Sequence, residues 1–168
     1  MRLMRNSGVY VLKLVKGKYY VGQSNDIPYR ITQHMYGNGS QYTNKFRIIN
    51  TLKPLTFPQT NLWELSETLE RMKLHGIDNV RGSMFSDIKL TTDQKIMAAQ
   101  LYSEMKHYCR KCGSPVHLEK DCDSGDKVAS WVQQFGGQLQ PNILCKVCDT
   151  PVNNNSYYCS DLCEYLDK

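Results

Sequence analysis

The first part of the chain alternates between short apolar runs and polar breaks, a pattern typical of β-strands joined by tight turns. Residues 8–15 (GVYVLKLV) are rich in β-branched and apolar side chains, and residues 19–24 (YYVGQS) form a second run of the same kind. Between them lies the polar segment Lys16-Gly17-Lys18, which contains a glycine. The pattern therefore predicts a β-hairpin near the start of the chain.

The length of the hairpin turn decides which face of the sheet its tyrosines occupy. A three-residue turn is expected to place Leu14 opposite Tyr20 and Tyr10 opposite Ser24. Tyr10 and Tyr20 then project from the same face, because side chains alternate along each strand. A two-residue turn would put the two tyrosines on opposite faces. We predict the longer turn.

Helical signals follow the hairpin. Asn25-Asp26 before Ile27-Pro28 combines a capping residue with an early proline, which is typical of a helix start. Residues 62–75 carry apolar side chains at helical spacing and stop at Gly76, a common residue just past a helix end. Residues 91–107 begin with a capping-box pattern. Three helices are therefore expected before the first cysteine.

Two further segments complete the picture of the first half. Residues 36–46 (YGNGSQYTNKF) are polar and contain glycines, so we expect a loop that lies over a substrate backbone. Residues 46–55 predict another strand, ended by a proline-containing stretch around Phe57-Pro58. Together these elements predict an α+β fold, a small sheet flanked by helices.

Composition divides the chain in two. All seven cysteines lie between Cys109 and Cys163, so a cysteine-free part precedes a cysteine-rich tail. The formal net charge of +5 suits a polyanionic partner such as DNA, although many proteins reach this value. No apolar run approaches the roughly 18 residues that span a bilayer, and no secretion signal is evident. We expect an intracellular protein, in which closely paired cysteines indicate metal binding more often than disulfides.

The first cysteine group has the spacing C-x2-C-x4-H-x4-C. Its candidate ligands are Cys109, Cys112, His117 and Cys122. This is the zinc-knuckle pattern, which folds around one tetrahedral Zn²⁺. His107 is an alternative to His117 but lies outside the pattern. Knuckles of this type resemble modules that stack nucleic-acid bases on aromatic side chains, and this one has no aromatic there. Phosphate contact by Arg110 and Lys111, or a structural or protein-contact role, is expected instead.

The second cysteine group has the spacing C-x2-C-x10-C-x3-C. Its candidate ligands are Cys145, Cys148, Cys159 and Cys163. Four thiolates at this spacing resemble a small zinc ribbon or treble-clef finger, and a redox or disulfide pair is the alternative. Three cysteines with one histidine, followed by four cysteines, use all seven thiols, so two structural Zn²⁺ ions are expected.

These signals give five expected segments. They are an α+β domain at 1–90, a connecting helix at 91–107, a zinc knuckle at 108–123, a linker with a helix at 124–141, and a four-cysteine zinc finger at 142–168.

Residues with suitable chemistry for phosphodiester hydrolysis gather in the first segment. Arg30 and His34 are four residues apart and so share one helical face. Arg30 can hold two phosphate oxygens with its guanidinium. Glu67 offers a hard oxygen ligand for a single Mg²⁺ or Mn²⁺, and Glu64 or Glu70 of the same predicted helix could replace it.

The order of these residues resembles a known family. Gly8-Val9-Tyr10 and Tyr20-Val21-Gly22, followed by the arginine, histidine and glutamate above, are similar to the GIY-YIG endonuclease domain. Residues 76–82 (GIDNVRG) also resemble the end of this domain in small nucleases of large DNA viruses and protists. The resemblance covers about half of the chain.

The resemblance implies a role for each matched residue. Tyr10 would be the general base, although a phenol has an ordinary pKa of about 10 and needs neighbouring positive charge to act at neutral pH. Tyr20 and His34 would orient water and phosphate or assist proton transfer. Asn79 and Arg81 would contact substrate, and the alternative for Asn79 is to close the turn after the preceding helix.

We therefore expect a divalent-metal-dependent endonuclease acting on DNA, branched or single-stranded forms included, with zinc modules that aid substrate binding. Two alternatives are a catalytically idle nucleic-acid-binding protein and a zinc-dependent protein-interaction adaptor. The second of these predicts no salt-dependent affinity for DNA.

Overall fold

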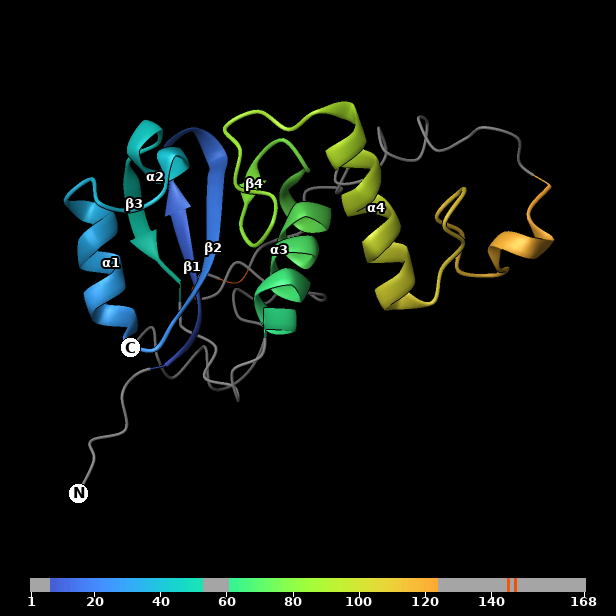
Figure 1. Cartoon of the computed structure of the whole chain (residues 1–168), viewed down its shortest axis with the longest axis horizontal. Coiled ribbons are helices and arrows are strands. Elements are labelled where there is room, and N and C mark those ends of the chain that lie inside the picture. The colour runs from blue at the N-terminus through green and yellow to red at the C-terminus, as the bar shows by residue number, and fades with distance from the viewer. Residues whose placement is uncertain (1–6, 53–60, 124–144, 146, 148–168) are drawn as a thin grey trace, which may run out of the picture.

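A four-stranded sheet forms the centre of the computed structural model, which describes residues 7–52, 61–123, 145 and 147 (Figure 1). The strands are β1 (Gly8–Leu14), β2 (Lys18–Ser24), β3 (Ile48–Thr51) and β4 (Val80–Arg81), in the spatial order β3-β1-β2-β4. β1 is antiparallel to β2 and β3, and β2 is parallel to β4. Within the described residues the sheet is accompanied by four α-helices, which confirms the α+β prediction. They are α1 (Ile27–Met35), α2 (Gln41–Lys45), α3 (Asn61–His75) and α4 (Thr92–Lys106).

The hairpin forms as predicted, but its register differs by two residues. Tyr10 lies opposite Gly22 and Leu14 lies opposite Lys18, so the predicted pairing of Tyr10 with Ser24 is wrong. The reason is the turn, a short 3-10 helix at Val15–Gly17 in which Lys16 has a left-handed φ of 62°. Because a shift of two positions keeps the alternation of side chains, Tyr10 and Tyr20 still share one face.

Helices α1 and α2 cover the face that carries these tyrosines (Figure 1). α1 begins where predicted, because the Asp26 side chain accepts the N–H of Tyr29 at 3.1 Å. The expected loop at 36–46 instead contains α2. Ser40 caps this helix by accepting the Thr43 N–H at 3.1 Å, and Tyr42 is buried beneath it. Capping and burial together turn a polar, glycine-containing segment into a short helix.

The opposite face of the sheet is covered by α3, against which α4 packs (Figure 1). α3 ends where predicted, with Gly76 at a φ of 97° donating its N–H to the Met72 carbonyl at 2.9 Å. α4 opens with the predicted capping box, in which Thr91 and Gln94 bond each other's backbone N–H groups. The core on this side is made of buried, mostly aliphatic side chains: Val9, Val11, Tyr19, Val21, Leu52, Leu69, Met72, Ile77, Val80, Phe85, Leu90, Ala98, Ala99 and Tyr102.

Some predictions are only partly covered by the described residues. The strand expected at 46–55 is β3, which spans Ile48–Thr51, while the proline-containing stretch lies outside the described residues. The linker at 124–141 also lies outside them, as does the finger at 142–168 except for Cys145 and Val147. Among the described helices, none combines the length and apolar character that a membrane crossing requires.

Candidate active site and metal centre

Tyr10 and His34 form the centre of the candidate active site. The Tyr10 hydroxyl lies 2.8 Å from Nε2 of His34, and both side chains are buried. The Tyr20 ring lies against the same imidazole, with ring centroids 5.0 Å apart. The hairpin and α1 therefore bring together three of the residues that the sequence indicated.

Gly22 lets the Tyr10 ring cross β2. A Cβ on Gly22 would lie 2.3 Å from the Tyr10 hydroxyl oxygen, a distance that real structures do not tolerate. The last residue of the Tyr20-Val21-Gly22 triplet is therefore glycine for a steric reason. The phenol occupies the space where a side chain would stand.

We expect Gly22→Ala to displace the Tyr10 phenol and to destabilise the fold by about 1–3 kcal/mol, the usual cost of overpacking. The free energy of unfolding, measured with urea, checks this. A double-mutant cycle with Tyr10→Leu provides the control, because removing the ring also removes the clash. Additive effects of the two substitutions would contradict the steric role of Gly22.

The other ring nitrogen of His34, Nδ1, also has a hydrogen-bond partner. Nδ1 lies 2.8 Å from the Thr43 hydroxyl oxygen, and that hydroxyl lies 3.0 Å from the Ser40 carbonyl oxygen. Gly39 covers the ring closely, since a Cβ there would lie 2.1 Å from Nδ1. Burial, together with the positive charge of Arg30, lowers the pKa of His34 to about 4. His34 is therefore neutral at pH 7.

Burial also keeps both tyrosines protonated at neutral pH. It raises the pKa of Tyr10, the charge of Tyr20 adds to this increase, and a hydrogen bond with Arg30 opposes it. Burial likewise raises the pKa of Tyr20, and a hydrogen bond with the Ser40 side chain opposes that increase. A base role for Tyr10 therefore needs a partner that takes its proton, and His34 Nε2 is in contact with it.

Arg30 lies one turn before His34 on α1, partly exposed. One guanidinium nitrogen donates to the Gln33 side chain at 2.8 Å, and the positive charge acts on both Tyr10 and His34. A guanidinium has five N–H donors, so bonds to Gln33 and Tyr10 leave capacity for a phosphate. Contact of Arg30 with a substrate phosphate stays a prediction.

Glu64 is the carboxylate whose charge affects the pKa values of the two tyrosines. Its negative charge adds to the effect of burial in raising the pKa of both Tyr10 and Tyr20. One of its oxygens accepts the Ser83 N–H at 2.9 Å, and burial raises its own pKa. The carboxylate of Glu67 instead lies 2.6 Å from Nε of Arg71, one turn further along α3. The structure thus places Glu67 in an internal ion pair with Arg71, while the charge of Glu64 acts on the phenols.

Arg81 and Asn79 have structural positions. Arg81 is buried, and its guanidinium donates to the carbonyl oxygens of Ile77, Val80, Asp87 and Ile88. With four of its five donors used internally, the expected contact with substrate does not fit this structure. Asn79 donates to the His75 carbonyl at 2.8 Å and accepts from Lys18 at 2.6 Å. It closes the turn after α3, the alternative noted from the sequence.

Several residues of the site escaped the sequence analysis. Gly39, Ser40 and Thr43 hold His34 from α2 and the segment before it, which had been expected to form a loop over substrate. The serine after a glycine was a possible helix-cap signal. Such a signal predicts where α2 begins, but it does not predict that α2 packs against His34 of α1.

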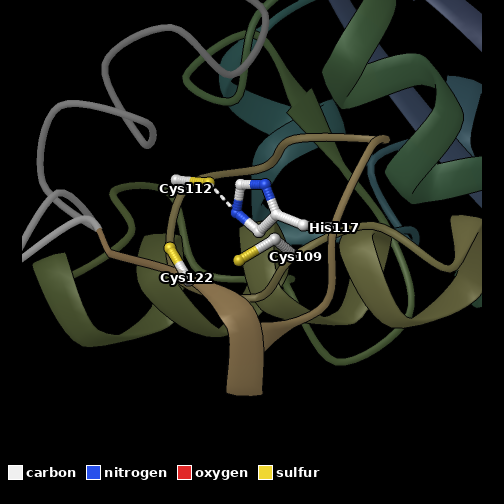
Figure 2. Close-up of side chains that lie close together, drawn as sticks. All are labelled: Cys109, Cys112, His117 and Cys122. Atoms are coloured by element: carbon white, nitrogen blue, oxygen red, sulfur yellow. Dashed lines mark hydrogen bonds between the residues drawn. The ribbon is translucent and has the colours of Figure 1, made fainter.

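The predicted ligands of the first zinc site come together after α4 (Figure 2). The sulfur atoms of Cys109, Cys112 and Cys122 and a nitrogen of His117 all lie within 4.8 Å of one another, and Cys112 Sγ is 3.2 Å from His117 Nε2. A tetrahedral Zn²⁺ with bonds of about 2.0–2.3 Å separates its ligand atoms by about 3.5–3.8 Å. The donor set and its spacing therefore fit zinc. The prediction of this Cys/His cluster is confirmed.

The cluster is joined closely to α4. His107, the alternative ligand, caps α4 in a left-handed conformation with a φ of 59°. The next residue, Tyr108, donates its N–H to the Ser103 carbonyl at 2.8 Å. Cys109, which follows it, is buried. The surface of this module exposes Val116 and Leu118. Of the second predicted set only Cys145 is described, and it is buried; the other three cysteines lie outside the described residues.

Comparisons with known proteins agree with this geometry. Residues 6–73 match the model of the GIY-YIG catalytic domain, which is less than half of the chain. A UPF0213 protein from Halalkalibacterium halodurans is 29% identical over 92 residues, which cover 52% of this chain and 98% of that protein. No solved structure matches the chain, and the likeness to viral nucleases stays a prediction. The chain therefore carries a GIY-YIG domain, a nuclease fold, at residues 6–73, followed by a Cys/His cluster suited to a metal ion.

Proposed function

We propose that this chain is a divalent-metal-dependent endonuclease that hydrolyses DNA phosphodiester bonds. The observation that supports it most is the meeting of Tyr10, Tyr20 and His34 on one face of the sheet. Arg30 supplies positive charge from α1, and Glu64 supplies negative charge from α3. A phosphate held here would meet a cation, a proton acceptor and a metal ligand together.

Each residue of the site has a separate role in the proposed reaction. Arg30 holds the scissile phosphate and offsets its negative charge. Tyr10 receives the proton of the attacking water while its own proton passes to His34, which it already contacts. Tyr20, against the same imidazole and bonded to Ser40, orients the water or the phosphate.

Glu64 suits a hard divalent cation. It is partly buried and, within the described part of the chain, forms no salt bridge, so its charge has no partner there. The Ser83 N–H orients the carboxylate, as groups around metal ligands commonly do. Bound Mg²⁺ or Mn²⁺ would neutralise charge on the phosphate and make a nearby water more acidic. We propose Glu64 as the ligand in place of Glu67, whose carboxylate is engaged by Arg71.

The cysteine-rich tail is proposed to bind two structural Zn²⁺ ions and to aid substrate binding. The first site would use Cys109, Cys112, His117 and Cys122. This module lies at the opposite end of the molecule from α1 (Figure 1). A nucleic acid contacted by both would be held at two separate places, which suits branched or single-stranded DNA. The exposed Arg110 and Lys111 are the phosphate contacts proposed for it.

Cleavage of a DNA panel tests the proposed function. Linear duplex, single-stranded, flap and junction DNAs are incubated with the full chain and Mg²⁺ or Mn²⁺, with EDTA as the metal-free control. We expect cutting of at least one substrate, and a decrease on the order of 10²–10⁴-fold in Tyr10→Phe, which removes the proton-transferring hydroxyl.

Two other results would select the alternatives. DNA binding that weakens with salt, without cutting of any substrate, would identify an idle nucleic-acid-binding protein. No salt-dependent affinity for DNA at all would favour the protein-interaction adaptor.

A further inference from the structure

A chain of hydrogen bonds runs from Tyr10 of the hairpin through α1 to α2. It runs from the Tyr10 hydroxyl to His34 Nε2 (2.8 Å), and from His34 Nδ1 to the Thr43 hydroxyl (2.8 Å). The Thr43 hydroxyl continues to the Ser40 carbonyl oxygen (3.0 Å) and lies 3.2 Å from the Ser40 hydroxyl. Both nitrogens of His34 are therefore engaged, each with a hydroxyl group.

The Ser40 carbonyl oxygen offers the Thr43 proton an acceptor that cannot donate. It lies 3.0 Å from the Thr43 hydroxyl, which favours a Thr43 proton directed at it and away from Nδ1. The Thr43 oxygen then accepts from His34, which requires a proton on Nδ1. A neutral imidazole carries one proton, so Nε2 presents a lone pair to the Tyr10 hydroxyl.

We propose that Thr43 is a positioning residue that fixes His34 in its Nδ1–H tautomer, so that Nε2 can take the Tyr10 proton during hydrolysis. This inference rests on the proposed nuclease function. In the opposite tautomer, Nε2–H would donate to the Tyr10 oxygen, and His34 could not receive a proton from Tyr10.

Each proton in the hydrolysis has a defined destination. The water oxygen bonds to phosphorus while the bond from phosphorus to the leaving sugar oxygen breaks. One water proton passes to the Tyr10 oxygen as the Tyr10 proton passes to Nε2, and His34 becomes an imidazolium. The leaving oxygen takes a proton from solvent, and His34 later returns its proton to solvent.

Substrate binding favours this transfer. Burial, and to a smaller extent the positive charge of Arg30, disfavours a proton on His34. A phosphodiester beside Arg30 brings a negative charge that offsets the part due to Arg30.

The tautomer of His34 is measured by long-range ¹H–¹⁵N correlation NMR on the full zinc-bound chain at neutral pH, with His34→Gln used to assign the signals. We expect the wild-type spectrum to show a protonated Nδ1 and an unprotonated Nε2. Thr43→Val removes the acceptor with little change in shape, so the Nε2–H tautomer should increase. Thr43→Ser keeps a hydroxyl and should retain the wild-type pattern.

Cleavage kinetics give the second readout. We expect kcat of Thr43→Val to decrease on the order of 10²-fold with KM nearly unchanged, because proton transfer and not binding is affected. Thr43→Ser should recover most of the rate. A Thr43 that only packs or caps α2 would change stability and leave the tautomer as it was.

Several outcomes would overturn the inference. A protonated Nε2 of His34 in the wild-type chain would overturn it, even if Thr43→Val does not fold. An unchanged tautomer in a folded Thr43→Val variant does so too. If the wild-type chain cuts no DNA but shows Nδ1–H, the proposed function and the proton transfer both fall, while the positioning of His34 by Thr43 stands.

Discussion

Replacing Glu64 with glutamine is expected to lower kcat for DNA cleavage in Mg²⁺ by about 10³-fold or more, equivalent to about 4 kcal/mol of transition-state stabilisation. The amide keeps an oxygen for the Ser83 N–H but removes the negative charge that a divalent cation needs. The same substitution at Glu67 is expected to lower kcat by less than about tenfold. Single-turnover cleavage at saturating enzyme measures the two rates.

The two substitutions should have the opposite order of effects on stability. Glu67→Gln breaks the ion pair with the buried Arg71, and a decrease of about 1–3 kcal/mol in the free energy of unfolding is expected. Glu64→Gln should leave stability nearly unchanged or increase it, because burial penalises the charged carboxylate. A larger loss of cleavage in Glu67→Gln than in Glu64→Gln would restore Glu67 as the metal ligand.

The second large effect is expected when zinc is removed, and it concerns the structure of the cysteine-rich segment after α4. A structural Zn²⁺ site contributes on the order of 10 kcal/mol to folding of its module, so the segment after α4 should lose its structure without metal. Native mass spectrometry should find two Zn²⁺ ions in the wild-type chain and one in Cys109→Ser. Cys145→Ser provides the matched control: it should also retain one ion, and the double variant none.

The zinc count discriminates between models of the tail. Fewer than two ions in the wild-type chain would contradict the two-module model. An unchanged count in Cys109→Ser would show that the cluster of Figure 2 is not a zinc site. The GIY-YIG domain should keep its sheet in Cys109→Ser, because its core is formed by residues that precede the cluster.

Local signals in the sequence predicted most of the fold. The capping box of Thr91 and Gln94 fixed the start of α4, and Gly76 fixed the end of α3, since both signals act within a few residues. The shared face of Tyr10 and Tyr20 depends on the alternation of side chains and so survived an error of two residues in register. The register itself depends on the left-handed turn at Lys16, which composition does not reveal.

The sequence by itself determined which chemical groups are present and which of them are near neighbours along the chain. It paired Arg30 with His34 on one helix and grouped three cysteines with His117, because helical periodicity and short loop closure are local properties. It favoured Glu67 over Glu64, three residues away on the same helix. We propose Glu64 instead because of its contact with Ser83 and its effect on the tyrosines, which lie on segments distant in sequence.

Tertiary structure also decided the roles of Arg81 and Thr43. In the sequence Arg81 is a cation beside a nuclease motif, yet packing buries it among four carbonyl oxygens, which bind its donors. Thr43 is an ordinary polar residue in a predicted loop, yet α2 carries it to Nδ1 of His34. Hydrogen-bond partners that come from different elements are set by how those elements pack, and this information is absent from any single stretch of sequence.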